Sequence, residues 1–97
     1  MNHKLCDTVI KTEEGFDGVN SYTYQLLVRK GETTADWQIP LYSFRVRMTD
    51  KDGINREAEA KDIFSDEKKA YDFFDKIVRN LATPIDLAYI IEDELHG

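Results

Sequence analysis

The sequence has little of what secreted and membrane proteins need. It holds a single cysteine, Cys6, two prolines, and no apolar run near the roughly 18 residues of a membrane span. One cysteine cannot form a disulfide within the chain, which fits a reducing compartment. The first residues, MNHKLCDTV, lack the apolar core of a signal peptide. We therefore expect a cytoplasmic protein.

Positive charge is scarce as well. The chain has 13 Lys and Arg against 19 Asp and Glu, a net charge of −6 and a pI near 4.8. Nucleic acids and anionic membranes are bound through Lys and Arg that displace condensed counterions. The charge balance therefore predicts that neither nucleic acid nor a membrane is a partner.

What the sequence does contain is typical of one folded domain. Hydrophobic residues make up 41% of the 97 residues and aromatic residues 11%, and no Pro-, Ser- or Gln-rich tract interrupts them. A chain of this length has room for one core. We expect a single domain over residues 1–97.

Alternating apolar and polar side chains predict strands near residues 4–11, 21–29, 41–49 and 54–62. The alternation is clearest in SYTYQLLVR and LYSFRVRMT, which indicates half-buried strands. Between the first two strands, EEGFDGVN supplies two glycines and Asp17, the residues with which a chain reverses. The last strand is ambiguous, because Glu57 to Lys61 are good helix formers.

Turn chemistry favours a hairpin for the third and fourth strands. Lys51, Asp52 and Gly53 fit a three-residue loop in which Gly53 takes the left-handed position. Pairing outward from this loop places opposite charges on one face and apolar pairs on the other. The predicted pairs are Arg47 with Glu57, Arg45 with Glu59, Val46 with Ala58 and Phe44 with Ala60.

Two helices are predicted near residues 66–81 and 84–95. Ser65, followed by Asp66 and Glu67, is expected to cap the first, and Thr83 with Pro84 to open the second. Their core-facing stripes are Ala70, Phe73, Phe74, Ile77, Val78 and Leu81, then Leu87, Ile90, Ile91 and Leu95. The fold class is α+β: a four-stranded antiparallel meander with two C-terminal helices on one face, in the order ββββαα.

Catalytic and metal-binding machinery is not visible in the sequence, so we expect no catalytic residue, metal or cofactor. No G-x-S-x-G elbow or phosphate-binding glycine loop is present, and His3 with Cys6 offers only two ligands. The Asp50 to Gly53 turn lacks the later ligands of a calcium loop. The acids of the last helix do not converge, and we interpret them as its solvated side: Asp86, Glu92, Asp93 and Glu94.

Two candidate surfaces follow from the predicted sheet. The first is an interaction surface on the face opposite the helices, with a tryptophan of the preceding loop: Gln25, Leu27, Arg29, Arg45, Arg47 and Trp37. The simpler interpretation is a solvated face with arginines neutralised by Glu57 and Glu59, and a tryptophan packed on the core. The second is a layer of hydroxyls that fits a small-ligand pocket under the helices: Tyr22, Tyr24, Tyr42 and Tyr71.

The stretch AKDIFSDEKKAYDFFDKIVRNLATPIDLAYIIEDEL resembles the end of a family of small uncharacterised proteins from Gram-positive, mostly clostridial, bacteria. In that family a strand ends in D-I-S-T-D, and after a helix a T/S-P-x-H-L turn leads into V-x-E-D-F/L. Asp86 stands where the family usually has His. The matching residues are Asp62, Ile63, Ser65, Asp66, Thr83, Pro84, Leu87, Glu92 and Asp93. The resemblance covers mainly the C-terminal half and implies the architecture and a bacterial cytoplasm, with no activity to carry over.

Two classes of function remain. The first is a non-catalytic protein-interaction or regulatory module, whose partner is another protein or a second copy of the chain in a homodimer. The alternative is a small-ligand-binding protein, or an enzyme without a visible motif, with its pocket between the aromatic strands and the helices.

Overall fold

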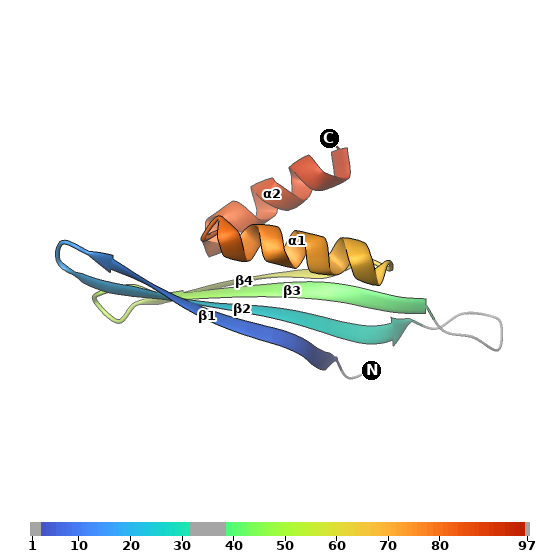
Figure 1. Ribbon diagram of the computed structural model, residues 1–97, viewed down its shortest axis with the longest axis horizontal. Helices are drawn as coiled ribbons and strands as arrows, with labels where there is room; N and C mark the ends of the chain where they lie inside the picture. Colours follow the sequence, from blue (N-terminus) through green and yellow to red (C-terminus); the bar gives the residue numbers. More distant parts are fainter. Residues whose placement is uncertain (1–2, 32–38, 97) are drawn as a thin grey trace.

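The computed structural model describes residues 3–31 and 39–96. Its elements are β1 (Lys4–Gly15), β2 (Gly18–Gly31), β3 (Ile39–Thr49), β4 (Asn55–Phe64), α1 (Glu67–Arg79) and α2 (Pro84–His96). The strands form one antiparallel sheet in the order β1-β2-β3-β4, and both helices lie on the same face (Figure 1). The predicted ββββαα fold is confirmed. Below, the helix-covered side is the inner face and the other side is the outer face.

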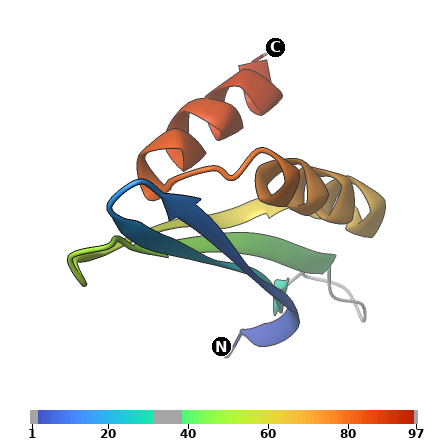
Figure 2. The ribbon, with the colours of Figure 1, turned by 60° about the vertical axis from the view of Figure 1, so that its left-hand side comes forward.

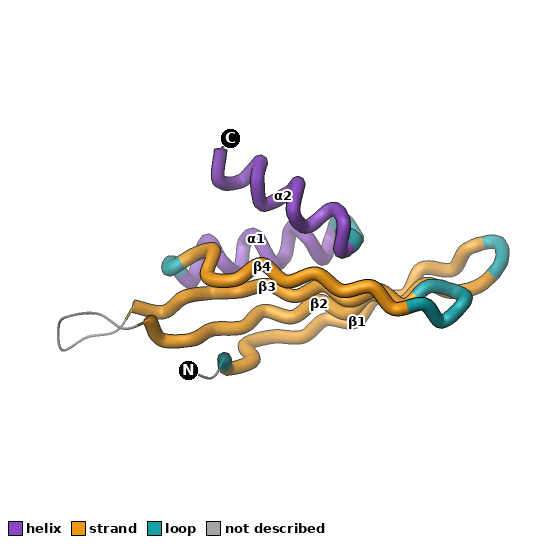
Figure 3. The backbone as a smooth tube through the Cα atoms, turned by 180° about the vertical axis from the view of Figure 1, so that it is seen from behind, coloured by secondary structure: helices purple, strands orange, loops and turns teal. Residues whose placement is uncertain are grey.

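The first hairpin is longer than the sequence indicated. Phe16 and Asp17 alone form its turn, and Gly15 pairs with Gly18, so much of EEGFDGVN belongs to the strands. A Cβ at Gly18 would lie 2.8 Å from the Cβ of Lys51, so only glycine lets the two hairpin turns approach this closely. Both hairpins project past the helices at one end of the molecule, which measures 55 × 30 × 17 Å (Figures 1 and 3).

The second hairpin has the predicted loop and register. Gly53 has a φ of 81°, and its N–H donates to the Asp50 carbonyl at 2.9 Å. Asp50 in turn donates its N–H to the Ile54 carbonyl, which closes a three-residue loop over residues 51–53. All four predicted cross-strand pairs are present: Arg47 with Glu57, Arg45 with Glu59, Val46 with Ala58 and Phe44 with Ala60.

Figure 2 shows from a second direction that both helices lie over one face of the sheet, and the core residues fill the layer between them. Phe44 of β3 is its centre: the side chain is fully buried, and its ring lies 4.9 Å from Phe73 of α1 and 6.0 Å from Phe64, edge to face. Such aromatic pairs add about 0.5–1.5 kcal/mol to the gain from burial alone. The other fully buried large side chains are Tyr24, Leu26, Val46, Phe73, Ile77 and Leu87.

Helix α1 begins one residue later than predicted. Asp66, not Ser65, is its N-cap: Asp66 has extended dihedral angles, and its Oδ1 accepts the N–H of Lys68 at 3.1 Å. A carboxylate is both a good cap and a favourable charge at the positive end of the helix dipole. At the other end Leu81 is left-handed, with a φ of 49°, and Ala82 donates its N–H back to the Ile77 carbonyl.

The start of α2 confirms the predicted cap. Asp86 donates its N–H to Thr83 Oγ1 at 3.2 Å, and Thr83 donates its N–H to Asp86 Oδ2 at 3.1 Å. This reciprocal arrangement is a capping box, here with Pro84 at the first helical position. The Asp86 carboxylate therefore has a structural role at the start of α2.

Candidate functional site

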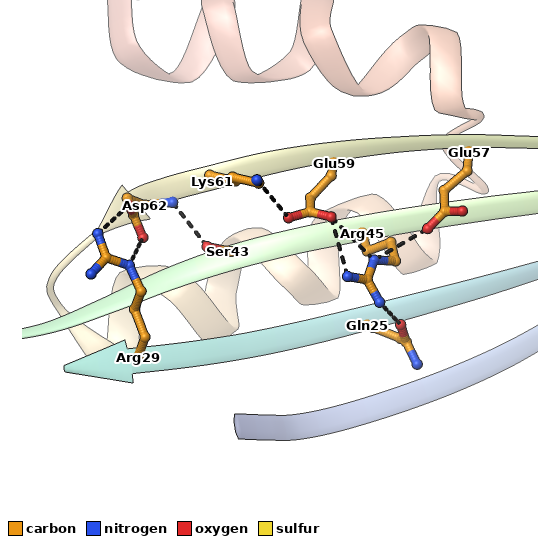
Figure 4. A network of polar contacts seen from close by, with 8 residues as sticks. All are labelled: Gln25, Arg29, Ser43, Arg45, Glu57, Glu59, Lys61 and Asp62. Atoms are coloured by element: carbon orange, nitrogen blue, oxygen red, sulfur yellow. Dashed lines mark hydrogen bonds and ion pairs between the residues drawn. The ribbon is translucent and has the colours of Figure 1, made fainter. Parts of the chain in front are cut away.

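Arg45 and Arg47 of β3 are held by carboxylates of the neighbouring strand β4, as Figure 4 shows for Arg45. Arg45 lies between two acids: Nε is 3.2 Å from Glu57 Oε1, and Nη2 is 3.2 Å from Glu59 Oε2. Its Nη1 donates to Gln25 Oε1 at 3.3 Å, and Arg47 reaches Glu57 at 3.5 Å. These contacts are the cross-strand neutralisation expected for a solvated sheet face. Each exposed pair contributes about 0–1 kcal/mol.

Arg29 belongs to a second ion pair, which is bidentate. It crosses β3 to reach Asp62 of β4, donating from Nε to Oδ1 at 3.0 Å and from Nη2 to Oδ2 at 2.6 Å (Figure 4). The Arg29 guanidinium lowers the pKa of the Asp62 carboxyl below its ordinary value. Asp62 has a φ of 54°, and its N–H donates to the buried hydroxyl of Ser43 at 2.9 Å. This pair fixes an irregular end of β4.

Two further residues of the predicted interaction surface, Leu27 and Trp37, do not form part of the exposed polar face that the structure describes. Leu27 is only 8% exposed, although it points away from the helices, and its cross-strand neighbours are Leu5 and Ser43. It therefore offers little contact area to a partner. Trp37 lies outside the described residues.

The tyrosine layer is divided between the two ends of α1. Tyr24 donates its hydroxyl to the Ala82 carbonyl at 2.9 Å, beyond the C-terminus of the helix. Tyr42 donates to Glu67 Oε2 at 3.4 Å, at the N-terminus, and Tyr71 is 40% exposed. The fourth, Tyr22, donates to Glu13 Oε1 at 3.1 Å. Three of the four hydroxyls thus already donate to oxygens of the protein.

Burial decides how these tyrosines titrate. It raises the pKa of Tyr24 far above its ordinary value and also raises the pKa values of Tyr22 and Tyr42, each with a carboxylate nearby. A neutral hydroxyl that donates to a protein oxygen stabilises the fold and is a poor general base at neutral pH. The layer is therefore better suited to structure than to proton transfer.

The remaining ionisable side chains that the structure describes are not arranged as a metal centre. Within residues 3–31 and 39–96, no three His, Cys, Asp or Glu side chains come together as ligands. Burial raises the pKa of the Cys6 thiol, which makes the reactive thiolate scarcer. Among the acids of α2, Asp86 caps the helix and Glu94 lies 3.5 Å from Lys76. Neither described helix is long and apolar enough to cross a membrane.

Sequence reasoning missed the projecting hairpin of β1 and β2. Three large apolar side chains line it and are exposed: Ile10 (65%), Phe16 (105%) and Val19 (48%), which we call the hairpin patch. Ile10 and Val19 share the outer face, opposite Thr23 and Glu14, while Phe16 occupies the turn. The sequence did indicate that Ile10 lies on the outer face, because Ile10 directly follows the core-facing Val9 in an extended strand.

The comparisons with known proteins identify a family but no activity. Neither the curated proteins nor the solved structures include a match to this sequence. One family model does match, over residues 3–97, and its description states a family of unknown function. The similarity therefore spans the strands as well as the C-terminal half. Because the match covers nearly the whole chain, the protein belongs to DUF6514, a family of unknown function.

Proposed function

We propose that this chain is a non-catalytic protein-interaction or regulatory module that binds a protein partner through the hairpin patch. The observation that carries the proposal is Phe16, an aromatic side chain that is fully exposed at the tip of a hairpin extending past the helices. Buried aromatic residues supply a large share of the energy of protein interfaces. A domain of this size gains nothing for its own core from an apolar ring held in water.

The surroundings of the patch indicate the chemistry of the partner. Glu13, Glu14 and Asp17 flank the turn, while Lys51 of the second hairpin already pairs with Asp17 at 3.0 Å. The rim is therefore predominantly acidic. An apolar pocket with basic residues around it is the complementary surface, and such complementarity raises the association rate and the specificity.

The test is an affinity capture of the tagged protein from a lysate of its source organism, read by mass spectrometry. We expect one protein in stoichiometric amount with the native chain, and its loss with a Phe16→Ser/Ile10→Thr variant. Both substituted side chains are exposed, so the variant should fold normally. An Arg45→Glu/Arg47→Glu variant is the matched control and should retain the partner.

The same experiment decides between the two surfaces. Loss of the partner only from the arginine variant would move the site to the outer face around Gln25, Arg29, Arg45 and Arg47, where each arginine has a carboxylate neighbour. If neither the native chain nor the variants capture a protein, the interaction proposal is wrong.

The setting that we propose for this module is the cytoplasm of a Gram-positive, clostridial bacterium, on the basis of the resemblance and the single cysteine.

The alternative is a small-ligand-binding protein or an enzyme that uses the tyrosine layer. Its support is weaker, because Tyr22, Tyr24 and Tyr42 donate their hydroxyls within the protein. A thermal-shift screen of small metabolites tests it. Stabilisation by one compound that is abolished in a Tyr42→Phe/Tyr71→Phe variant would favour this alternative over the interaction module.

A further inference from the structure

The strand β1 has a free edge in the described part of the chain. It is 12 residues long and lies at the end of the order β1-β2-β3-β4, so β2 is its only neighbour in the sheet (Figures 1 and 3). The other edge strand, β4, is packed against by α2. A long edge strand presents a row of unpaired N–H and C=O groups to any strand that can align with it.

The hairpin turn determines which groups of β1 point outward. In a hairpin with a two-residue turn, the flanking residues, here Gly15 and Gly18, form a hydrogen-bonded pair. Hydrogen-bonding direction alternates along a strand, so Val9 and Lys11 bond to β2, while the backbone groups of Thr8 and Ile10 point away. One observation supports this assignment: the Thr8 N–H is taken by a side chain, Asp7 Oδ1, at 2.8 Å.

We propose that β1 pairs antiparallel with β1 of a second copy of this chain, about a two-fold axis at Val9, and joins the two sheets into one. In this register Thr8 and Ile10 exchange backbone hydrogen bonds with their counterparts, and Asp7 lies opposite Lys11 on both sides of the axis. The inference rests on the proposed function, because it names a second copy as one partner of the module.

Charge selects this register. A two-fold axis normal to the sheet keeps like faces together, so the axis passes through a residue of β1. With the axis at Ile10, Asp7 opposes Glu13; with the axis at Lys11, that lysine opposes itself. Like charges directly opposite each other weaken a strand pair. Only the axis at Val9 matches Asp7 with Lys11.

A competing register has its axis at Thr12. It matches Lys11 with Glu13, yet it places the exposed Ile10 opposite Glu14 and shortens the overlap of the strands to residues 9–15. The register at Val9 instead brings two half-buried valines together and keeps Ile10 beside Thr8. Asp7 and Lys11 are both exposed, and both point to the inner face. The main contacts of β1 are with β2 and not with either helix.

Pairing has a cost that the structure shows. The Asp7 carboxylate must give up the Thr8 N–H. The exchange is close to balanced, because the N–H gains the Ile10 carbonyl of the second copy and the carboxylate gains Lys11. Asp7 thus protects the edge in a single chain and recognises the partner in the pair.

The first test is sedimentation of the purified protein over a range of concentrations. We expect a monomer–dimer equilibrium. Asp7→Lys and Lys11→Asp should each raise the dissociation constant at least tenfold, because like charges then face each other. An equimolar mixture of these two variants restores opposite charges and should dimerise as the native chain does. Lys69→Asp on α1, also exposed, is the matched control and should change nothing.

The second test fixes the register by disulfide trapping. In a Cys6→Ser/Val9→Cys variant the two cysteines would face each other at a non-hydrogen-bonded position, with Cα atoms about 4.5 Å apart, which suits a disulfide. We expect rapid cross-linking on oxidation. Faster cross-linking of Cys6→Ser/Thr12→Cys would overturn the register at Val9.

The outcomes separate this inference from the proposed function. A protein that sediments as a monomer up to its highest soluble concentration, or a mixture of Asp7→Lys and Lys11→Asp that stays monomeric while the native chain dimerises, overturns the β1 pairing. Neither result touches the capture experiment, which depends on Phe16 and a foreign partner. Conversely, a dimer that survives Phe16→Ser but is lost in Asp7→Lys supports the β1 edge and leaves the hairpin patch to its own test.

Discussion

Removing the Tyr24 hydroxyl tests whether the tyrosine layer holds the fold together or serves a ligand. The side chain is fully buried, and its hydroxyl donates to the Ala82 carbonyl at 2.9 Å, which links β2 to the connection between α1 and α2. Tyr24→Phe deletes this donor and keeps the ring, so no cavity opens in the core.

The size of the stability loss follows from the Ala82 carbonyl, which Tyr24→Phe leaves without a donor. Ala82 is 1% exposed, so its carbonyl has no route to solvent once the donor is gone. An unpaired buried acceptor costs about 1–3 kcal/mol. We expect Tyr24→Phe to lower the free energy of unfolding by about 2 kcal/mol. In a domain of this size, that corresponds to a fall in Tm of about 8–16 °C.

The assay is thermal and urea unfolding followed by circular dichroism, with Tyr89→Phe as the control. Tyr89 is 67% exposed, and its variant should stay within about 0.5 kcal/mol of the native chain. Burial raises the Tyr24 pKa, so its contribution is present below the ordinary tyrosine pKa and is lost as pH rises above about 10. The native chain should therefore lose stability in alkali more steeply than Tyr24→Phe. Equal stability of Tyr24→Phe and Tyr89→Phe would refute the reasoning.

Two further predictions concern the helix cap and the ion pair. Thr83→Ala should cost about 1 kcal/mol in urea unfolding, because the Asp86 N–H loses its acceptor, whereas Thr83→Ser should be nearly neutral; equal losses would contradict the capping box. Asp62→Asn, which tolerates the left-handed backbone, should cost about 1 kcal/mol at pH 7. Arg29 lowers the Asp62 pKa, so this contribution is present above the ordinary aspartate pKa and is lost as pH falls through the folded value. A difference between the native chain and Asp62→Asn that does not shrink as pH falls below the ordinary aspartate pKa would contradict the assignment.

The second hairpin was predictable in detail because several local signals agree. The loop at Gly53 sets the register, and the same register places Arg47 opposite Glu57 and Val46 opposite Ala58. A shift by one residue would have exchanged the charged and apolar faces. Loop geometry, charge and burial thus excluded the helix that the composition of residues 57–61 allowed.

The first strand was less predictable because a β-bulge changes its faces. The pairing shifts between Leu5 and Asp7, so Leu5 points to the outer face and Val9 to the inner face, although both have the same parity in the sequence. One extra residue in a strand leaves no mark in its composition. The sequence also predicted Ser65 as the N-cap of α1, whereas the structure has Asp66 there. Both residue types cap helices well, so the backbone geometry decides between them.

The sequence by itself determined the ββββαα order, the core-facing stripe of α1 and the cross-strand charge pairs of β3 and β4, because periodicity, caps and turns act over a few residues. The stripe predicted for α2 was wrong at Leu95, which is 53% exposed. Only the tertiary structure decided which surfaces remain open. Phe16 is exposed because the first hairpin extends beyond the helices, and Tyr24 meets Ala82 because of where the helices lie over the sheet. These two outcomes depend on residues far apart in the chain, and no local pattern encodes them.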